Sequence, residues 1–238
     1  MTRPETAFWT ICCAALLAAA ALGFWTHAAV GAACLALAGL LPLFSRVSGL
    51  DVPFRLTAGV LLFCAAALLF GELADGYEAA PWWDLMLHVV SAAALGVVGL
   101  ALALLPTAGA RPRTAVWILS TLAFGFAMMV GALWEVMEFA LDQTFGFNTQ
   151  DTGLPDTMWD VIANAAGAVL GVVAGHAALC HGTRWPLGGL LLDWVGRNPV
   201  IYGLWTGPFQ RAGGRALAGQ DRALQGRGQA GRGVIPGE

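Results

Sequence analysis

Six long apolar stretches separated by short loops limit what this chain can fold into. A helix needs about 20 apolar residues to cross the ~30 Å hydrocarbon core of a bilayer, and each stretch is close to that length. With 58% hydrophobic and 11% charged residues over 238 positions, the chain is too apolar for a soluble domain. We therefore predict an all-α fold, a polytopic membrane helical bundle of six transmembrane helices. The stretches are Phe8–Trp25, Ala28–Phe44, Phe54–Phe70, Trp82–Leu105, Ala115–Leu141 and Met158–Cys180.

Positive residues predict the orientation, because they resist translocation and gather in cytoplasmic loops. The chain has no lysine, and all twelve arginines fall on one side if six helices alternate. We predict that this side, with both termini, is cytoplasmic. If the first stretch were instead a cleaved signal sequence, the other five helices would keep this orientation. The extracytoplasmic side receives ten of the fifteen acidic residues and no basic one: Glu72, Asp75, Glu78, Asp84, Glu135, Glu138, Asp142, Asp151, Asp156 and Asp160.

The C-terminal part of the chain differs in composition from the rest. Residues 1–185 hold the predicted six-helix transmembrane domain. Residues 186–205 are apolar but interrupted by Asp193, Arg197 and Pro199, which favours a segment lying at the cytoplasmic membrane interface. Residues 206–238 are rich in glycine and arginine, and we predict a disordered basic tail held near anionic lipid.

Polar side chains form stripes on the last three helices, all at their extracytoplasmic ends. On the fourth helix, Asp84 and His88 lie four residues apart and share one face. The spacings of three and four residues repeat on the two helices that follow. Their stripes are Glu135, Glu138 and Asp142 on the fifth helix, and Asp156, Asp160 and Asn164 on the sixth.

The helical rise of about 1.5 Å per residue gives the depth of each side chain below the outermost acid of its stripe. By this count His88, Glu138 and Asp160 share a layer about 6 Å deep. Glu135 and Asn164 lie about 10 to 12 Å deep. We expect the three stripes to meet in the same leaflet.

These carboxylates lack a basic partner, since no arginine occurs between Arg113 and Arg184. A charged side chain at membrane depth costs about 3 kcal/mol on insertion scales, so the acids should face one another rather than lipid. Their charge must be balanced by protons, by His88, by a metal ion or by a cationic ligand.

The chemistry of the stripes suggests roles for their members. Glu135 and Glu138 lie near the C-terminal end of their helix, where the helix dipole does not stabilise negative charge. We therefore predict that one of them holds a proton and acts as a general acid or base. A histidine among carboxylates also suits a divalent metal ion such as Zn²⁺ or Mn²⁺. The predicted ligands are Asp84, His88 and Asp160, with Asn164 and Asp156 in support.

Each residue also has a plainer interpretation. Asp84 and Asp156 can serve as ordinary helix N-caps, and His88 as a packed or interfacial histidine. A glutamate pair inside an apolar helix is harder to explain structurally.

At the cytoplasmic end of the sixth helix, three residues are of types that bind metal ions: His176, Cys180 and His181. Their access to water favours an ordinary interface instead. Three glycines at every fourth position predict a face where helices pack closely. They are Gly167, Gly171 and Gly175.

Three motifs in order resemble the YjdF-type family of uncharacterised bacterial inner-membrane proteins. They are Trp82-Trp83-Asp84-Leu85-Met86-Leu87-His88, Trp134-Glu135-Val136-Met137-Glu138-Phe139, and Asp156-Thr157-Met158-Trp159-Asp160 followed by Asn164 and Gly167. The resemblance covers about residues 54–180 and implies a multi-pass protein of the bacterial inner membrane.

The chain is more distantly similar to the VanZ-like family, which is associated with resistance to glycopeptide antibiotics. It departs from that pattern where Leu85 replaces a basic residue and where Glu138 adds a second glutamate. That departure argues against carrying the resistance activity over to this chain.

The leading hypothesis is an extracytoplasmic acidic site that binds a metal ion or protons and acts on an envelope lipid or a cell-wall precursor. The alternatives are an ion- or proton-coupled transporter and a non-catalytic membrane partner protein. The residues leave open whether the protein is an enzyme. Its expected surroundings are the lipid bilayer, with no nucleic acid partner.

Overall fold

A computed structural model describes residues 3–74, 76–80, 82–107, 114–185 and 187–203. Within these ranges the chain is helical and contains no strand, as predicted. Asp75 and the predicted tail, residues 206–238, lie outside the described residues. The helices run in the order α1 (Arg3–Ala21), α2 (Trp25–Ser48), α3 (Phe54–Cys64), the π-helix η1 (Ala65–Glu72), α4 (Gly76–Ala79), α5 (Trp83–Leu104), the 3-10 turn η2 (Leu105–Thr107), α6 (Val116–Phe145), α7 (Leu154–His181), α8 (Gly188–Arg197) and α9 (Pro199–Tyr202).

Five helical stretches of the described chain are long and apolar enough to cross a membrane. The apolar helix that precedes them, Glu5–Ala21, is shorter than the five. The structure therefore supports a multi-pass helical protein, and the sixth span stays a prediction. The five stretches are Trp25–Ser48, Phe54–Gly71, Trp83–Thr107, Val116–Phe145 and Leu154–His181.

Helix ends differ from the predicted ones where glycine or loop contacts decide them. The first stretch was expected to reach Trp25, but Gly23 adopts a left-handed φ of 85° and Trp25 begins α2. Helix α6 continues to Phe145 before a left-handed Gly146 ends it. Helix α7 begins at Leu154, directly after left-handed Gly153. These extra turns lengthen the acidic end of the bundle.

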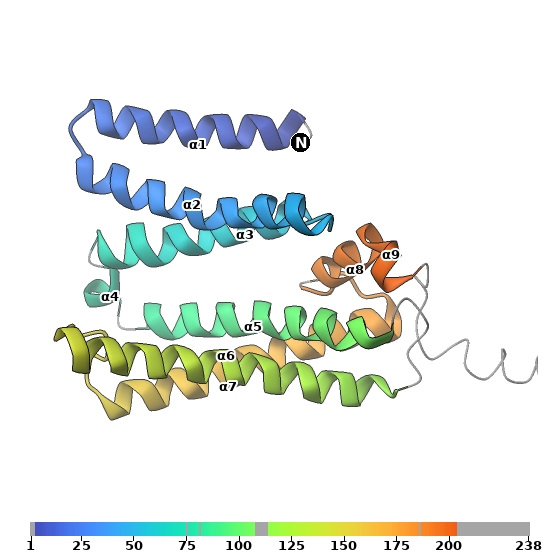
Figure 1. Ribbon diagram of the computed structural model, residues 1–238. Coiled ribbons are helices and arrows are strands. Elements are labelled where there is room, and N and C mark those ends of the chain that lie inside the picture. Colours follow the sequence, from blue (N-terminus) through green and yellow to red (C-terminus); the bar gives the residue numbers. More distant parts are fainter. Residues whose placement is uncertain (1–2, 75, 81, 108–113, 186, 204–238) are drawn as a thin grey trace, which may run out of the picture.

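The long helices lie side by side, with α1 at one edge and α6 and α7 at the other (Figure 1). Helices α5, α6 and α7 pack most extensively against one another, whereas α1 packs on α2 and α2 on α3. The α6–α7 loop and α4 lie at one end of the bundle, and the N-terminus, α8 and α9 lie at the other. The core fills the latter end, and its largest fully buried apolar side chains are Leu100, Leu104 and Leu191.

Glycine brings α7 into backbone contact with α5, which confirms the predicted packing face. A Cβ built on Gly167 would lie 2.2 Å from the carbonyl oxygen of Val89, and one on Gly171 would lie 2.0 Å from that of Ala93. At Gly175 the neighbour is a side chain instead, since a Cβ there would lie 2.3 Å from Leu100 Cδ1. Only glycine allows these helices to approach so closely.

The segment predicted to lie at the membrane interface packs onto the bundle as α8 and α9. Its apolar residues Leu191 and Val195 are 1% and 4% exposed and join the core. Asp193 pairs with Arg55 at 3.5 Å and with Arg184. This segment therefore connects α3 with the residues after α7 at this end of the bundle (Figure 1), and its place relative to the membrane stays a prediction.

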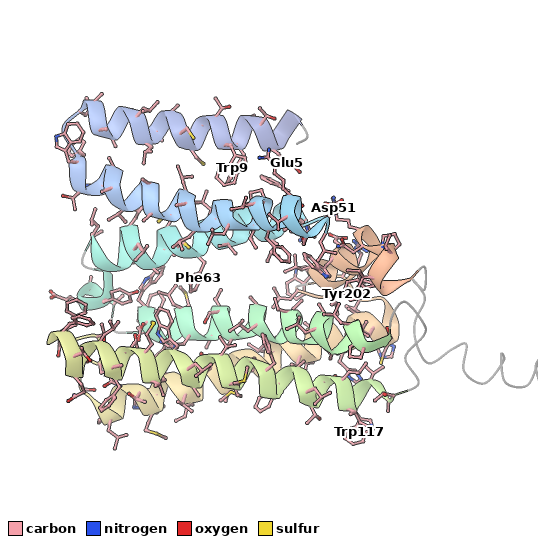
Figure 2. The ribbon with its side chains drawn as sticks, viewed as in Figure 1. Glu5, Trp9, Asp51, Phe63, Trp117 and Tyr202 are labelled. Carbon is pink, nitrogen blue, oxygen red and sulfur yellow. The ribbon has the colours of Figure 1, made fainter. Side chains whose placement is uncertain are left out.

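Asn198 makes a second tie, to the turn between α2 and α3. Its side chain accepts a hydrogen bond from the Asp51 N–H (2.7 Å) and donates to the Asp51 carbonyl (3.0 Å). Arg197 also approaches the Asp51 carboxylate at 3.2 Å. Asp51 and Tyr202, both labelled in Figure 2, mark this end of the molecule.

Candidate metal centre

The N-terminus of α5 is fixed by aromatic contacts to the π-helix η1. The Trp83 indole N–H donates to the Ala66 carbonyl at 3.3 Å, and its ring meets Phe70 with centroids 4.5 Å apart. A π-helix leaves the ordinary hydrogen-bonding register, and such segments are frequent at functional sites. Asp84 follows in the first turn of α5, where the helix dipole favours negative charge.

His88, one turn further along α5, is the centre of the cluster. Its Nε2 atom lies 3.8 Å from Asp84 Oδ1 and 3.7 Å from Asp160 Oδ1 of α7. One ligand atom from each of these three residues falls within 4.8 Å of the others. Two helices therefore present a histidine nitrogen and two carboxylate oxygens to one point.

The second ring nitrogen of His88 faces a different pair of side chains. Nδ1 lies 3.3 Å from Asn164 Oδ1 of α7 and 3.8 Å from Glu135 Oε1 of α6. Gly131, one turn before Glu135, makes room for the amide, since a Cβ there would lie 2.8 Å from Asn164 Nδ2. The imidazole thus separates Asp84 and Asp160 from Asn164 and Glu135.

The cluster is buried except at Asp84. Asp160, Asn164, Glu135 and His88 are 2%, 3%, 5% and 8% exposed, whereas the Asp84 side chain is 40% exposed. Four buried atoms make no hydrogen bond: both carboxylate oxygens of Glu135, Asp160 Oδ1 and Asn164 Nδ2. Three acids of the cluster lie within ion-pairing distance of His88, and within the described ranges no arginine contacts them: Asp84, Glu135 and Asp160. Such uncompensated burial is costly unless a proton or cation joins the group.

The prediction that Glu138 shares a layer with His88 is wrong, because Glu135, one turn deeper on α6, is the glutamate that lies near His88. Counting depth from Asp142 requires Asp142 and Asp84 to lie at one level, and the approach of Glu135 to His88 shows that they do not. Asp142 instead accepts hydrogen bonds from Thr149 and Gln150 of the following loop.

Two other predicted site residues lie outside the contacts of His88. Glu138 is half-buried one turn outward from Glu135, and its main-chain carbonyl accepts the Thr149 hydroxyl at 3.1 Å. Asp156 is half-buried one turn before Asp160. The structure thus brings together Asp84, His88, Asp160, Glu135 and Asn164, and places Glu138 and Asp156 at the rim.

Sequence reasoning missed Gly131, although its spacing of four residues from Glu135 is a usable signal for a shared helix face.

The histidine at the opposite end of α7 is bonded differently. His176 Nδ1 lies 2.9 Å from the Ser120 hydroxyl, which also donates to the Val116 carbonyl. Cys180 is buried and His181 exposed, so these residues do not present their ligand atoms together. Among the described residues, the grouping suited to a metal ion is the one at Asp84, His88 and Asp160.

Apolar helices of this length around a buried cluster of acids and histidine define a multi-pass helical membrane protein. The chain belongs to the family described as predicted membrane protein (DUF2238), whose model matches residues 5–181. The match spans α1 to α7 and every residue of the cluster. No significant match was found among curated proteins or among solved structures.

Proposed function

We propose that the protein binds a divalent metal ion through Asp84, His88 and Asp160 and uses it on an envelope lipid or a cell-wall precursor. The observation that carries the proposal is the convergence of three ligand atoms within 4.8 Å, two of them from buried residues. Histidine nitrogen with carboxylate oxygen suits Zn²⁺ or Mn²⁺. A divalent ion would also offset the buried carboxylates, for which the described residues supply no arginine.

The proposed topology has six transmembrane helices in the bacterial inner membrane and both termini in the cytoplasm. It is supported by the arginine distribution and by the position of the N-terminus at the same end as α8 and α9 (Figure 1). The YjdF-type and VanZ-like relations belong to the same proposal, since the description of the matched family names neither.

The proposed lipid substrate is supported by exposed tryptophans close in sequence to Asp84 and Asp160. Trp82, two residues before the partly exposed Asp84, and Trp159, the residue before Asp160, are 59% and 60% exposed, and tryptophan gathers at the headgroup level of membranes. Glu138, half-buried at the rim, is the proposed general acid or base. A metal ion held here would polarise a phosphoryl or carbonyl oxygen of a headgroup.

Metal binding is tested with the full chain in lipid nanodiscs, titrated with Zn²⁺ or Mn²⁺. We expect one ion per chain, lost in His88→Ala and Asp160→Asn. His27→Ala is the matched control, because His27 is exposed and lies at the start of α2, outside the cluster. Equal binding by wild type and His88→Ala would overturn the site, and so would a wild type that binds neither ion.

Turnover is tested by incubating the metal-loaded protein with vesicles containing phospholipids and undecaprenyl phosphates, followed by mass spectrometry of the lipids. We expect products with wild type and at least a tenfold loss with Glu138→Gln, consistent with the usual contribution of acid–base groups. Unaltered lipids together with metal uptake into sealed vesicles would support the transporter alternative instead.

The orientation has its own test. A reporter fused after Asp151 should be extracytoplasmic, and one fused after Gly182 should be cytoplasmic. The opposite result would place the cluster on the wrong side of the membrane for the proposed substrates.

A further inference from the structure

The Nδ1 atom of His88 faces two buried polar side chains that are not ligands of the proposed metal ion. Asn164 Oδ1 lies 3.3 Å from Nδ1, and Glu135 Oε1 lies 3.8 Å from it. Both side chains are at least nine-tenths buried and come from two different helices. Because buried side chains contact one ring nitrogen, the orientation of the imidazole is restricted, and so is the direction of its other nitrogen.

We infer that Asn164 is a positioning residue that sets which ring nitrogen of His88 binds the metal ion. The amide oxygen can only accept, so the neutral ring donates its Nδ1–H to it and Nε2 keeps the free electron pair. Nε2 is the nitrogen that faces Asp84 and Asp160. Metal-binding histidines ordinarily donate their other N–H to an oxygen in this manner. The inference rests on the proposed function of the same site.

Glu135 falls on the same side as Asn164 and so acts through His88. Its Oε1 atom lies 3.8 Å from Nδ1, and it is not one of the three residues whose ligand atoms converge. The sequence suggested a general acid or base at this position. The geometry instead makes Glu135 a buried carboxylate near the Nδ1 side of the ring, and leaves acid–base chemistry to Glu138.

The backbone supports this arrangement at two places. Gly131 leaves the space that the Asn164 amide occupies, because a Cβ would lie within 3.0 Å of its nitrogen and carbon. Gly167, one turn after Asn164, sits on the backbone of Val89, the residue next to His88. These two glycines hold α6 and α7 close enough to α5 for Asn164 to reach the ring.

The test is nuclear magnetic resonance of the ¹⁵N-histidine-labelled full chain in nanodiscs, with and without Zn²⁺. In the metal-free wild type we expect neutral His88 protonated at Nδ1, and with Zn²⁺ we expect Nε2 as the bound nitrogen. Asn164→Leu should weaken Zn²⁺ binding about 10- to 100-fold and mix the two tautomers. Asn164→Asp, which keeps an oxygen acceptor, should restore both the affinity and the Nδ1–H tautomer.

Ser120→Ala is the matched control, since Ser120 is also buried, also lies against a histidine of α7, and belongs to the other end of the bundle. It should leave Zn²⁺ binding unchanged. Equal loss of affinity in Asn164→Leu and Asn164→Asp, or ligation through Nδ1, would overturn the inference while leaving the metal site intact. If the wild type binds no Zn²⁺, the proposed function is overturned. If neutral His88 in the metal-free wild type is protonated at Nε2, the positioning role of Asn164 is overturned whether or not Zn²⁺ binds.

For Glu135, X-ray absorption of bound Zn²⁺ distinguishes a ligand from a supporting group. Glu135→Gln should lower Zn²⁺ affinity by about tenfold and leave the number of oxygen and nitrogen ligands unchanged. Loss of one oxygen neighbour in this variant would show that Glu135 binds the ion directly.

Discussion

Replacement of Gly167 by alanine tests whether the packing of α5 on α7 and the metal centre are one structure. The added Cβ would lie 2.2 Å from the Val89 carbonyl oxygen, and real Cβ contacts essentially never fall below 3.0 Å. The obstructing atom is backbone, so the two helices must separate by about 1 Å. Overpacking of this kind typically costs about 1–3 kcal/mol, and an unyielding partner favours the upper end of that range.

The same displacement should reach the site, because Val89 adjoins His88 and Gly167 lies one turn from Asn164. Metal–ligand distances tolerate only about 0.2 Å, so a ~1 Å separation should weaken Zn²⁺ binding at least tenfold. Unfolding in detergent and Zn²⁺ titration measure the two effects. Gly125→Ala is the control, since a Cβ there meets nothing within 4 Å and alanine favours the helix. If Gly167→Ala matched Gly125→Ala in both assays, the reasoning would be refuted.

Three further perturbations test other parts of the fold. Asn198→Ala removes three hydrogen bonds to main-chain groups and should lower the free energy of unfolding by about 2–3 kcal/mol, against less than about 1 kcal/mol for the exposed Arg197→Ala. Burial raises the pKa of Tyr202, so the folded state favours the neutral phenol; stability should fall as the pH rises above about 10, and less so in Tyr202→Phe. Asp142→Ala removes the acceptor of three hydrogen bonds from the α6–α7 loop, and amide exchange across residues 146–153 should accelerate at least tenfold.

Most of the helical framework could be predicted from the sequence, because the length of each apolar stretch can be counted along the chain. It was less informative about helix ends. Gly23, Gly146 and Gly153 end or begin helices through left-handed backbone, which apolar content does not register. The docking of α8 was also beyond prediction, since its attachment depends on partners distant in sequence, such as Asp193 with Arg55.

The meeting of the three polar stripes could be predicted from the sequence, but the depth and orientation of each side chain could not. The stripes correctly indicated that Asp84, His88 and Asp160 meet, because a spacing of four residues puts side chains on one helix face. Depth along separate helices was harder to judge, since it depends on how far each helix projects. In the structure Glu135, not Glu138, lies near His88, so Asp142 and Asp84 do not mark the same depth. Which ring nitrogen each acid faces depends on helix rotation, which spacing alone does not give.

The concentration of polar chemistry in α5, α6 and α7 follows from the glycine contacts between them. Helices ordinarily pack with their axes 8–10 Å apart, whereas small residues bring the backbones closer. At Gly167 the approach is close enough for one histidine to meet side chains from two neighbouring helices at once. In α1 to α3, by contrast, the described residues include no buried acid or histidine. The close seam is therefore a condition of the site, and a substitution that widens it should disturb metal binding even where every ligand is retained.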